Sequence, residues 1–314
     1  MIYHRTDDFL FSYNDIGAKM LQCKKRKDKK MAIFYNRATL TFNGQSLNSN
    51  QVSGEITESL TITKTAISGS YSIGDNIAYA ISISNTALTG VENISLTDDL
   101  GAYSYGGGTL IPLTYRDGSL LYYIDGVLQP TPTVTAGDQL VISGISVPAG
   151  ANVTLIYEAT VNSFAPLAAG SSITNTASIN GCQAGTSISD TATVSIVEAP
   201  ELSIAKAICP QVINCSGEVN YTFIIQNTGN TAVVATDDLI VTDNFDPVLS
   251  NIVVTLNGVT LAEGTGYTYD DTTGAFATLP GIVTVDAATY TQDPTSGLIT
   301  VNPGVSVLTV SGTV

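Results

Sequence analysis

Two lysines stand at matching positions in a repeated pattern, and they are the only lysines after residue 30. Lys64 lies in LTITKTA and Lys206 lies in LSIAKAI, each behind two apolar residues spaced two apart. Alternation with a period of two predicts a strand that turns these apolar residues and the lysine to its inward face. A buried charged lysine is costly unless it is paired or neutralised. Each lysine therefore needs a chemical partner.

Acid and amide residues recur at matching places as well. Asp98 in SLTDDL corresponds to Asp243 in IVTDNF, and Asn175 in SITNTAS corresponds to Asn36 in FYNRAT. A lysine, an aspartate and an asparagine together point to an autocatalytic isopeptide bond. Burial lowers the pKa of the lysine and raises that of the aspartate, so a neutral amine attacks the asparagine carbonyl while the acid polarises it and shuttles the proton. Ammonia leaves and an amide remains.

We expect one bond within the chain and one between chains. Lys64, Asp98 and Asn175 form the intramolecular trio; Lys206 and Asp243 lack a downstream asparagine, which Asn36 of a neighbour would supply. Asp99 is an alternative to Asp98, although its side chain should point to the opposite face. The plain alternative is that both amines reach solvent and that the Asp and Asn residues form turns.

An internal repeat explains where these residues fall. Residues 60–100 match 202–245 element by element, and 138–161 match 296–314. The first copy continues with two strands over 172–196, whereas the second copy stops. The segment 34–56 resembles 172–196, so the N-terminal end carries what the second repeat lacks.

The composition predicts the fold class. Hydrophobic residues make up 44% of the 314 residues and charged residues 12%, and Thr, Ser, Gly, Asn, Val and Ile dominate, as in half-buried strands joined by polar turns. We expect an all-β protein with two tandem immunoglobulin-like β-sandwich domains preceded by an N-terminal β-hairpin. The expected segments are a donor hairpin over 31–58, domain one over 59–198, and domain two over 199–314 without its C-terminal hairpin.

Residues 1–30 stand apart from the rest. They hold eight of the twelve Lys and Arg residues and lack the apolar core of a signal peptide. We interpret them as a doubtful basic leader upstream of a start at Met31; a basic tail is the alternative.

The charge and residue inventory excludes several classes. The net charge is −15 and the basic residues are concentrated in the first 30 positions, so the body should repel nucleic acids and anionic membranes. One histidine cannot build a catalytic triad or a multi-histidine metal site. We expect no enzyme beyond single-turnover self-crosslinking, no cofactor, no metal and no membrane span.

The four cysteines are less informative. Cys209 and Cys215 flank a loop short enough for a disulfide, which either forms there or leaves both thiols free. Cys182 is expected at a hairpin tip, and Cys23 belongs to the doubtful leader.

The recurring L-x-I-x-K, G-D/E-x-x-x-Y, N-T, T-D and I-T-N-T-A elements over residues 33–314 resemble the bacterial surface repeat family catalogued as domain of unknown function 11. The resemblance implies immunoglobulin-like domains in cell-surface, spore-surface or appendage proteins.

These observations predict a self-assembling subunit of an extracellular or spore-surface fibre, joined head to tail by donor-strand complementation and locked by Lys206 to Asn36. The chain itself is then the partner. The alternative is a monomeric surface adhesin or carbohydrate-binding stalk module, which would contact a surface glycan or host ligand through tyrosines of the segment 103–123.

Overall fold

A computed structural model describes residues 32–56, 60–182, 186–212 and 217–314. The basic leader, with Cys23, lies outside these residues, and so does Cys215. The described residues are almost entirely strands and turns, apart from a single 3-10 turn, η1 (Ala235–Asp237). They fall into two compact units, one within 1–58 and the other within 59–314.

The first unit is an antiparallel hairpin of four short strands. β1 (Ala32–Asn36) pairs with β4 (Val52–Ile56), and β2 (Thr39–Phe42) pairs with β3 (Gln45–Asn48). The tip is Asn43-Gly44, with φ of 48° and 77°. Two consecutive positive φ values define the tight turn that suits the twist of a two-stranded ribbon, and Asn-Gly adopts it at low cost. The predicted N-terminal hairpin is therefore present.

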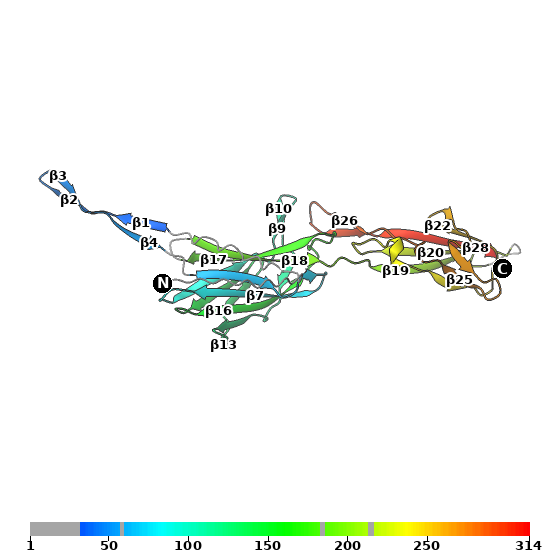
Figure 1. The fold of residues 1–314 in the computed structure, drawn as a ribbon, viewed down its shortest axis with the longest axis horizontal. Helices are drawn as coiled ribbons and strands as arrows, with labels where there is room; N and C mark the ends of the chain where they lie inside the picture. Colours follow the sequence, from blue (N-terminus) through cyan, green and yellow to red (C-terminus); the bar gives the residue numbers. More distant parts are fainter. Residues whose placement is uncertain (1–31, 57–59, 183–185, 213–216) are drawn as a thin grey trace, which may run out of the picture. The chain divides into compact units, whose positions relative to one another are not determined.

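Domain one is a sandwich of two layers, whose strands pair antiparallel except for the short parallel pairing of β18 with β6 (Figure 1). One sheet has the order β13-β12-β16-β7-β5, with β11 also paired to β16, and the other has the order β14-β15-β8-β17-β18-β6. A separate small ribbon is formed by β9 and β10. The bounds are β5 (Leu60–Ala66), β6 (Ser70–Tyr71), β7 (Asn76–Asn85), β8 (Val91–Asp98), β9 (Tyr103–Tyr105), β10 (Gly108–Leu110), β11 (Leu113–Tyr115), β12 (Leu121–Ile124), β13 (Val127–Gln129), β14 (Thr133–Ala136), β15 (Leu140–Val147), β16 (Asn152–Val161), β17 (Ser172–Cys182) and β18 (Thr186–Ile196).

Alternation of apolar and polar residues places the core of domain one between these sheets. On β7 the side chains of Ile77, Tyr79, Ile81 and Ile83 are fully buried while the residues between them are partly exposed. β16 shows the same pattern, and its residues run antiparallel to β7 along the whole strand. A sheet with one inward face requires this period of two.

Domain two repeats the first layer and only part of the second. Its larger sheet has the order β19-β20-β28-β22-β23, facing a three-stranded sheet β21-β25-β24, and β26 and β27 form a separate ribbon. The bounds are β19 (Leu202–Cys209), β20 (Glu218–Asn227), β21 (Thr242–Asn244), β22 (Ser250–Leu256), β23 (Val259–Thr260), β24 (Tyr267–Tyr269), β25 (Ala275–Thr278), β26 (Thr289–Gln292), β27 (Ile299–Asn302) and β28 (Gly304–Thr313).

The two sandwiches contact each other through the β9–β10 and β26–β27 ribbons. Gln292 donates from Nε2 to the Tyr103 hydroxyl at 2.9 Å, and the Tyr105 hydroxyl donates to the backbone oxygen of Gln292 at 2.7 Å. Asn230 of domain two donates to the backbone oxygen of Val197 at 3.0 Å. Separate buried clusters nevertheless lie within each sandwich.

Candidate isopeptide site

The side chain of Lys64 points into domain one. β5 reads LTITKTA, and its buried positions alternate with exposed threonines, so Leu60, Ile62 and Lys64 face the core. The backbone N–H of Lys64 donates to the carboxylate of Asp190 on β18 at 2.8 Å, which ties the strand to the opposite sheet. The predicted inward orientation of this lysine is confirmed.

Inside the core Lys64 meets Asp98, the last residue of β8. The amine lies 2.6 Å from Asp98 Oδ2, and neither side chain is exposed. Asp98 Oδ1 accepts a hydrogen bond from the backbone N–H of Leu100 at 3.1 Å. A buried charge is tolerated only with a partner of this kind, since desolvation of each ion costs several kcal/mol.

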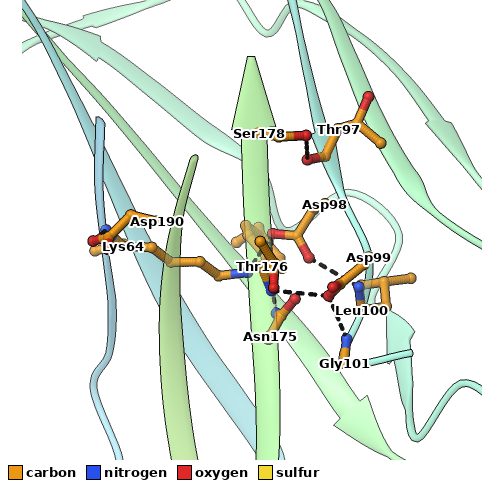
Figure 2. A network of polar contacts seen from close by, with 12 residues as sticks. Lys64, Thr97, Asp98, Asp99, Leu100, Gly101, Asn175, Thr176, Ser178 and Asp190 are labelled. Atoms are coloured by element: carbon orange, nitrogen blue, oxygen red, sulfur yellow. Dashed lines mark hydrogen bonds and ion pairs between the residues drawn. The ribbon is translucent and has the colours of Figure 1, made fainter. Parts of the chain in front are cut away.

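Asn175 reaches this pair through a tyrosine. The Tyr157 hydroxyl donates to Asp98 Oδ2 at 2.6 Å, and Asn175 donates from Nδ2 to the same hydroxyl at 3.0 Å. Lys64, Asp98 and Asn175 come from three different strands, and Figure 2 shows the lysine side chain extending toward the other two. The fold thus brings the predicted trio together, with Tyr157 between the acid and the amide.

Two polar atoms beside this network lack a hydrogen-bond partner among the described residues: the Tyr79 hydroxyl and Asn175 Oδ1, both buried. Burial raises the pKa of Tyr79 and the neighbouring Asn175 side chain opposes that rise, although the Tyr79 hydroxyl has no hydrogen-bond partner among the described residues. The carbonyl of Asn175 is therefore desolvated, with its lone pairs unoccupied. Such a carbonyl is open to polarisation when charge develops on it.

Burial controls the electrostatics of the site. Desolvation lowers the pKa of Lys64 and outweighs the opposing attraction of Asp98. Desolvation also raises the pKa of Tyr157 well above its usual value, so this hydroxyl keeps its proton. The amine lies 4.9 Å from the ring centroid of Tyr79 and 6.0 Å from that of Tyr157, where ring faces stabilise a cation. The set therefore combines an amine, a carboxyl group, a proton-bearing hydroxyl and an amide in a dry core.

Asp99 has a different role from Asp98. Its Oδ1 accepts from the backbone N–H groups of Thr176 at 2.8 Å and Gly101 at 2.9 Å, and its own N–H donates to the Thr176 oxygen at 3.0 Å (Figure 2). These bonds join the end of β8 to β17. Asp98, and not Asp99, makes the ion pair with Lys64.

Domain two holds a second pair with no amide beside it among the described contacts. Lys206 on β19 forms an ion pair with Asp243 on β21, with 40% of the lysine side chain and 18% of the aspartate side chain exposed. The rings of Tyr221, Phe223 and Phe245 lie 4.6 to 5.3 Å from the amine. Asn36 lies exposed on the hairpin of the first unit.

Solved structures resemble this chain at low identity. The chain matches BcpA, the major pilin subunit of Bacillus cereus, at 13% identity with a TM-score of 0.34, over 86% of this chain and 73% of that one. The match to a 35 kDa C-terminal fragment of the major pilin GBS80 of Streptococcus agalactiae has 13% identity and a TM-score of 0.34, over 78% of this chain and 91% of that fragment. The match to the pilus backbone RrgB from Streptococcus pneumoniae has 14% identity and a TM-score of 0.32. It covers 78% of this chain and 55% of the RrgB chain.

The chain is an all-β protein of tandem sandwiches. No protein-family model and no curated protein matches the sequence, so the resemblance to the bacterial surface repeat family stays a prediction.

The remaining sequence predictions concern metals, membranes and cysteines. In the described part of the chain, no three His, Cys, Asp or Glu side chains gather as metal ligands, and no helix is long and apolar enough to span a membrane. Cys209 is exposed at the end of β19, but the predicted disulfide involves Cys215, outside the described residues. That disulfide stays a prediction.

Sequence reasoning missed Tyr157. Its signal was the alternation in NVTLIYEATV, which turns this tyrosine inward. An inward tyrosine usually denotes a core side chain with one bonded hydroxyl, so the strand pattern does not single out a bridge between two reactive groups.

Proposed function

We propose that the chain is a self-assembling structural subunit of an extracellular or spore-surface fibre, in which the hairpin Ala32–Ile56 of one copy completes domain two of another. The proposal includes two self-formed isopeptide bonds: Lys64 to Asn175 within domain one, and Lys206 to Asn36 between copies. The chain is its own partner and performs no turnover on other substrates.

The carrying observation is the unequal burial of two equivalent strands. Leu60 and Ile62 on β5 are 4% and 9% exposed, whereas Leu202 and Ile204 on β19 are 42% and 58% exposed. In domain one β5 packs against β18 of the opposite sheet. Among the described residues of domain two no strand takes that place over β19. Covering each of these side chains is worth on the order of 1 kcal/mol.

The opposite sheet of domain two has an open edge at the same place. In domain one β8 lies between β15 and β17, while in domain two its counterpart β21 pairs only with β25 among the described strands. Unpaired edges offer backbone donors and acceptors that direct the addition of another strand. Domain two therefore presents both a bare apolar face and a free edge.

The hairpin of the first unit has the matching side chains. Aligning Asn36 with Asn175 places Leu40 at the position of Ile179, and Leu47 pairs with Leu40 as Ile188 pairs with Ile179. Ile179 is fully buried in domain one, but Leu40 and Leu47 are 66% and 69% exposed. This exposure supports the proposal that the hairpin enters the core of another copy.

The same alignment gives the register of the intermolecular contact. In domain one Ala177 pairs with Asp98, and Asn175 stands two residues earlier on the same strand. Ala38 opposite Asp243 would then bring Asn36 to the Lys206–Asp243 pair. Strand pairing and the crosslink thus require one and the same register.

The direction of the chain favours assembly in a line. β18 leaves domain one beside Tyr71, where Val197 donates to the Tyr71 oxygen at 2.9 Å and domain two begins. A donor hairpin would leave domain two at its equivalent end, near Gly217, and lead into the next domain one. Leu60, by contrast, pairs with Asn85 at the opposite end of β7. Only residues 57–59 separate β4 from β5, which favours donation to another copy over closure within the same copy.

The adhesin alternative depended on exposed tyrosines in the segment 103–123, and the structure gives no observation that favours it. Tyr115 and Tyr122 are buried. The hydroxyls of Tyr103 and Tyr105 donate to backbone oxygens of Phe164 and Gln292.

The test is electron microscopy of the full chain at high concentration beside a variant lacking residues 32–56. The full chain should form fibres and the truncated variant should not. Added to the full chain, the truncated variant should shorten the fibres, because it accepts a hairpin and donates none. Fibres formed equally well by the truncated variant alone would refute hairpin donation.

A further inference from the structure

Tyr157 is placed between the group that takes up a proton and the group that must leave. Its hydroxyl donates to Asp98 Oδ2 at 2.6 Å and accepts from Asn175 Nδ2 at 3.0 Å. In the described contacts Asp98 has no direct hydrogen bond to Asn175; its acceptor atoms are occupied by Lys64, Tyr157 and Leu100. Any proton passing from the acid to the amide nitrogen along these bonds crosses the Tyr157 hydroxyl.

Proton delivery to that nitrogen is an unavoidable step. An amide nitrogen leaves as ammonia only if it gains a proton as its bond to carbon breaks. Tyr157 and Asn175 are both fully buried, so bulk water does not reach the nitrogen to supply this proton. Because burial holds the pKa of Tyr157 high, the hydroxyl carries the proton that a relay requires.

Domain two lacks this hydroxyl. Tyr79 pairs with Tyr157 across β7 and β16, and its counterpart Tyr221 pairs with Val310 across β20 and β28. Lys206, Asp243 and a ring at the Tyr79 position are all retained. Domain two also lacks the asparagine, which Asn36 of another copy would supply, and its relay position holds the aliphatic side chain of Val310.

We infer that Tyr157 is a catalytic residue of isopeptide formation in domain one, relaying a proton from Asp98 to the departing nitrogen of Asn175. The inference rests on the proposed function. Lys64 first gives a proton to the Asp98 carboxylate. The neutral amine attacks the Asn175 side-chain carbonyl carbon, a carbon–nitrogen bond forms, and the carbonyl electron pair moves to Oδ1.

When this intermediate collapses, the relay supplies the proton that the leaving nitrogen needs. Tyr157 gives its hydroxyl proton to Nδ2 and regains one from Asp98, the bond from carbon to Nδ2 breaks, and the carbonyl reforms as ammonia departs. The former lysine nitrogen returns its second proton to Asp98, which ends as the neutral acid. The net charge of the reacting groups stays at zero throughout, and no charged group remains buried once ammonia has left.

The first test uses the full chain carrying Lys206→Met, so that only the Lys64–Asn175 reaction releases ammonia. Intact mass under denaturing conditions is followed over time for this parent, for Tyr157→Phe and for Tyr71→Phe. Tyr71 is the matched control, since it is fully buried and its hydroxyl donates to the Pro166 oxygen. Circular dichroism and a cooperative melt establish that each variant is folded.

The parent and Tyr71→Phe should have lost the mass of one ammonia when purified, while folded Tyr157→Phe should lose it at least about 100-fold more slowly, the usual contribution of a general acid. Loss at the parental rate in Tyr157→Phe would overturn the relay and leave the crosslink standing. A parent that keeps its full mass would overturn the crosslink and the relay together.

A second measurement needs no variant at the relay and stands even where Tyr157→Phe fails to fold. In fibres of the unaltered chain, the Lys64–Asn175 bond should already be complete at assembly, whereas the Lys206–Asn36 bond should need a time at least about 100-fold longer than that reaction takes, because Val310 has no hydroxyl proton to give. Peptide mass spectrometry after digestion follows both bonds in one sample. Equal rates would overturn the relay.

Discussion

Lys64 and Lys206 are both paired with an aspartate, but the side chain of Lys64 is completely buried whereas that of Lys206 is 40% exposed. The two lysines occupy the same position on equivalent strands, paired opposite Ile81 and Phe223. The difference lies in what covers them. β17 and β18 close domain one over Lys64, and no described strand does so over Lys206. The exposed pair marks the place where a second copy is expected to dock.

Removing the aspartate of the buried ion pair should destabilise the fold far more than removing the acid of an exposed ion pair. In an Asn175→Ala background, where no crosslink forms, Asp98→Ala should lower the free energy of unfolding by about 3 to 5 kcal/mol, since it leaves the Lys64 amine desolvated and unpaired. Glu158→Ala, which removes the partner of the exposed Arg116, should cost about 1 kcal/mol or less. Denaturant titration measures both, and similar losses would contradict the burial argument.

Substituting the equivalent residues Ile62 and Ile204 by alanine should lower the stability of the unassembled chain by different amounts. Ile62→Ala should destabilise domain one by about 2 to 5 kcal/mol through a cavity in a closed core. Ile204→Ala should cost less than about 1 kcal/mol in dilute solution, because that side chain is already 58% exposed. Chemical denaturation at a concentration too low for fibres distinguishes them. A large loss from Ile204→Ala would show that its face is covered within the same copy.

Charges on the hairpin should act according to the face that carries them. Leu40→Asp should abolish assembly, because this position is expected to enter the core of domain two, where an unpaired carboxylate is costly. Thr41→Asp lies on the other face of β2 and should assemble nearly as well as the parent. Sedimentation velocity over a concentration series reports both. Equal effects of the two substitutions would speak against insertion of this face.

High pH should unfold the protein partly through its buried tyrosines. Burial raises the pKa of Tyr71 to about 12, so the folded chain holds this proton while the unfolded chain loses it above pH 10. Stability from this group is complete below pH 10 and falls as the pH rises to about 12, by roughly 1 kcal/mol per pH unit. Tyr71→Phe should reduce that slope in denaturant titrations between pH 10 and pH 12. An unchanged slope would exclude Tyr71 as a source.

The sequence predicted the parts of the site that depend on strand alternation. Period two on LTITKTA put Lys64 inside, and the matching repeats singled out Asp98 and Asn175, which the structure has on neighbouring strands of the opposite sheet. The likeness of 34–56 to 172–196 predicted a hairpin that pairs as β17 and β18 do. All of these follow from local pattern and repetition, which a single sequence displays.

The sequence did not predict contacts between segments that are distant along the chain. The bridge through Tyr157 depends on the register of β16 against β7 and on how close Asp98, at the end of β8, lies to the Tyr157 hydroxyl. Neither can be seen in the local sequence pattern. The bonds of Tyr103 and Tyr105 to Gln292 join ribbons nearly 190 positions apart, and the sequence indicated only aromatic residues of unknown exposure.

The most direct test of the central claim is a boiled, reducing denaturing gel of the full chain after prolonged incubation at high concentration, beside Asn36→Ala, Lys206→Met and the hairpin control Asn48→Ala. Head-to-tail donation with a Lys206–Asn36 bond predicts a ladder of multimers for the parent and Asn48→Ala, and single bands for the other two. A ladder that persists in Asn36→Ala, or a single band in every lane, would contradict it.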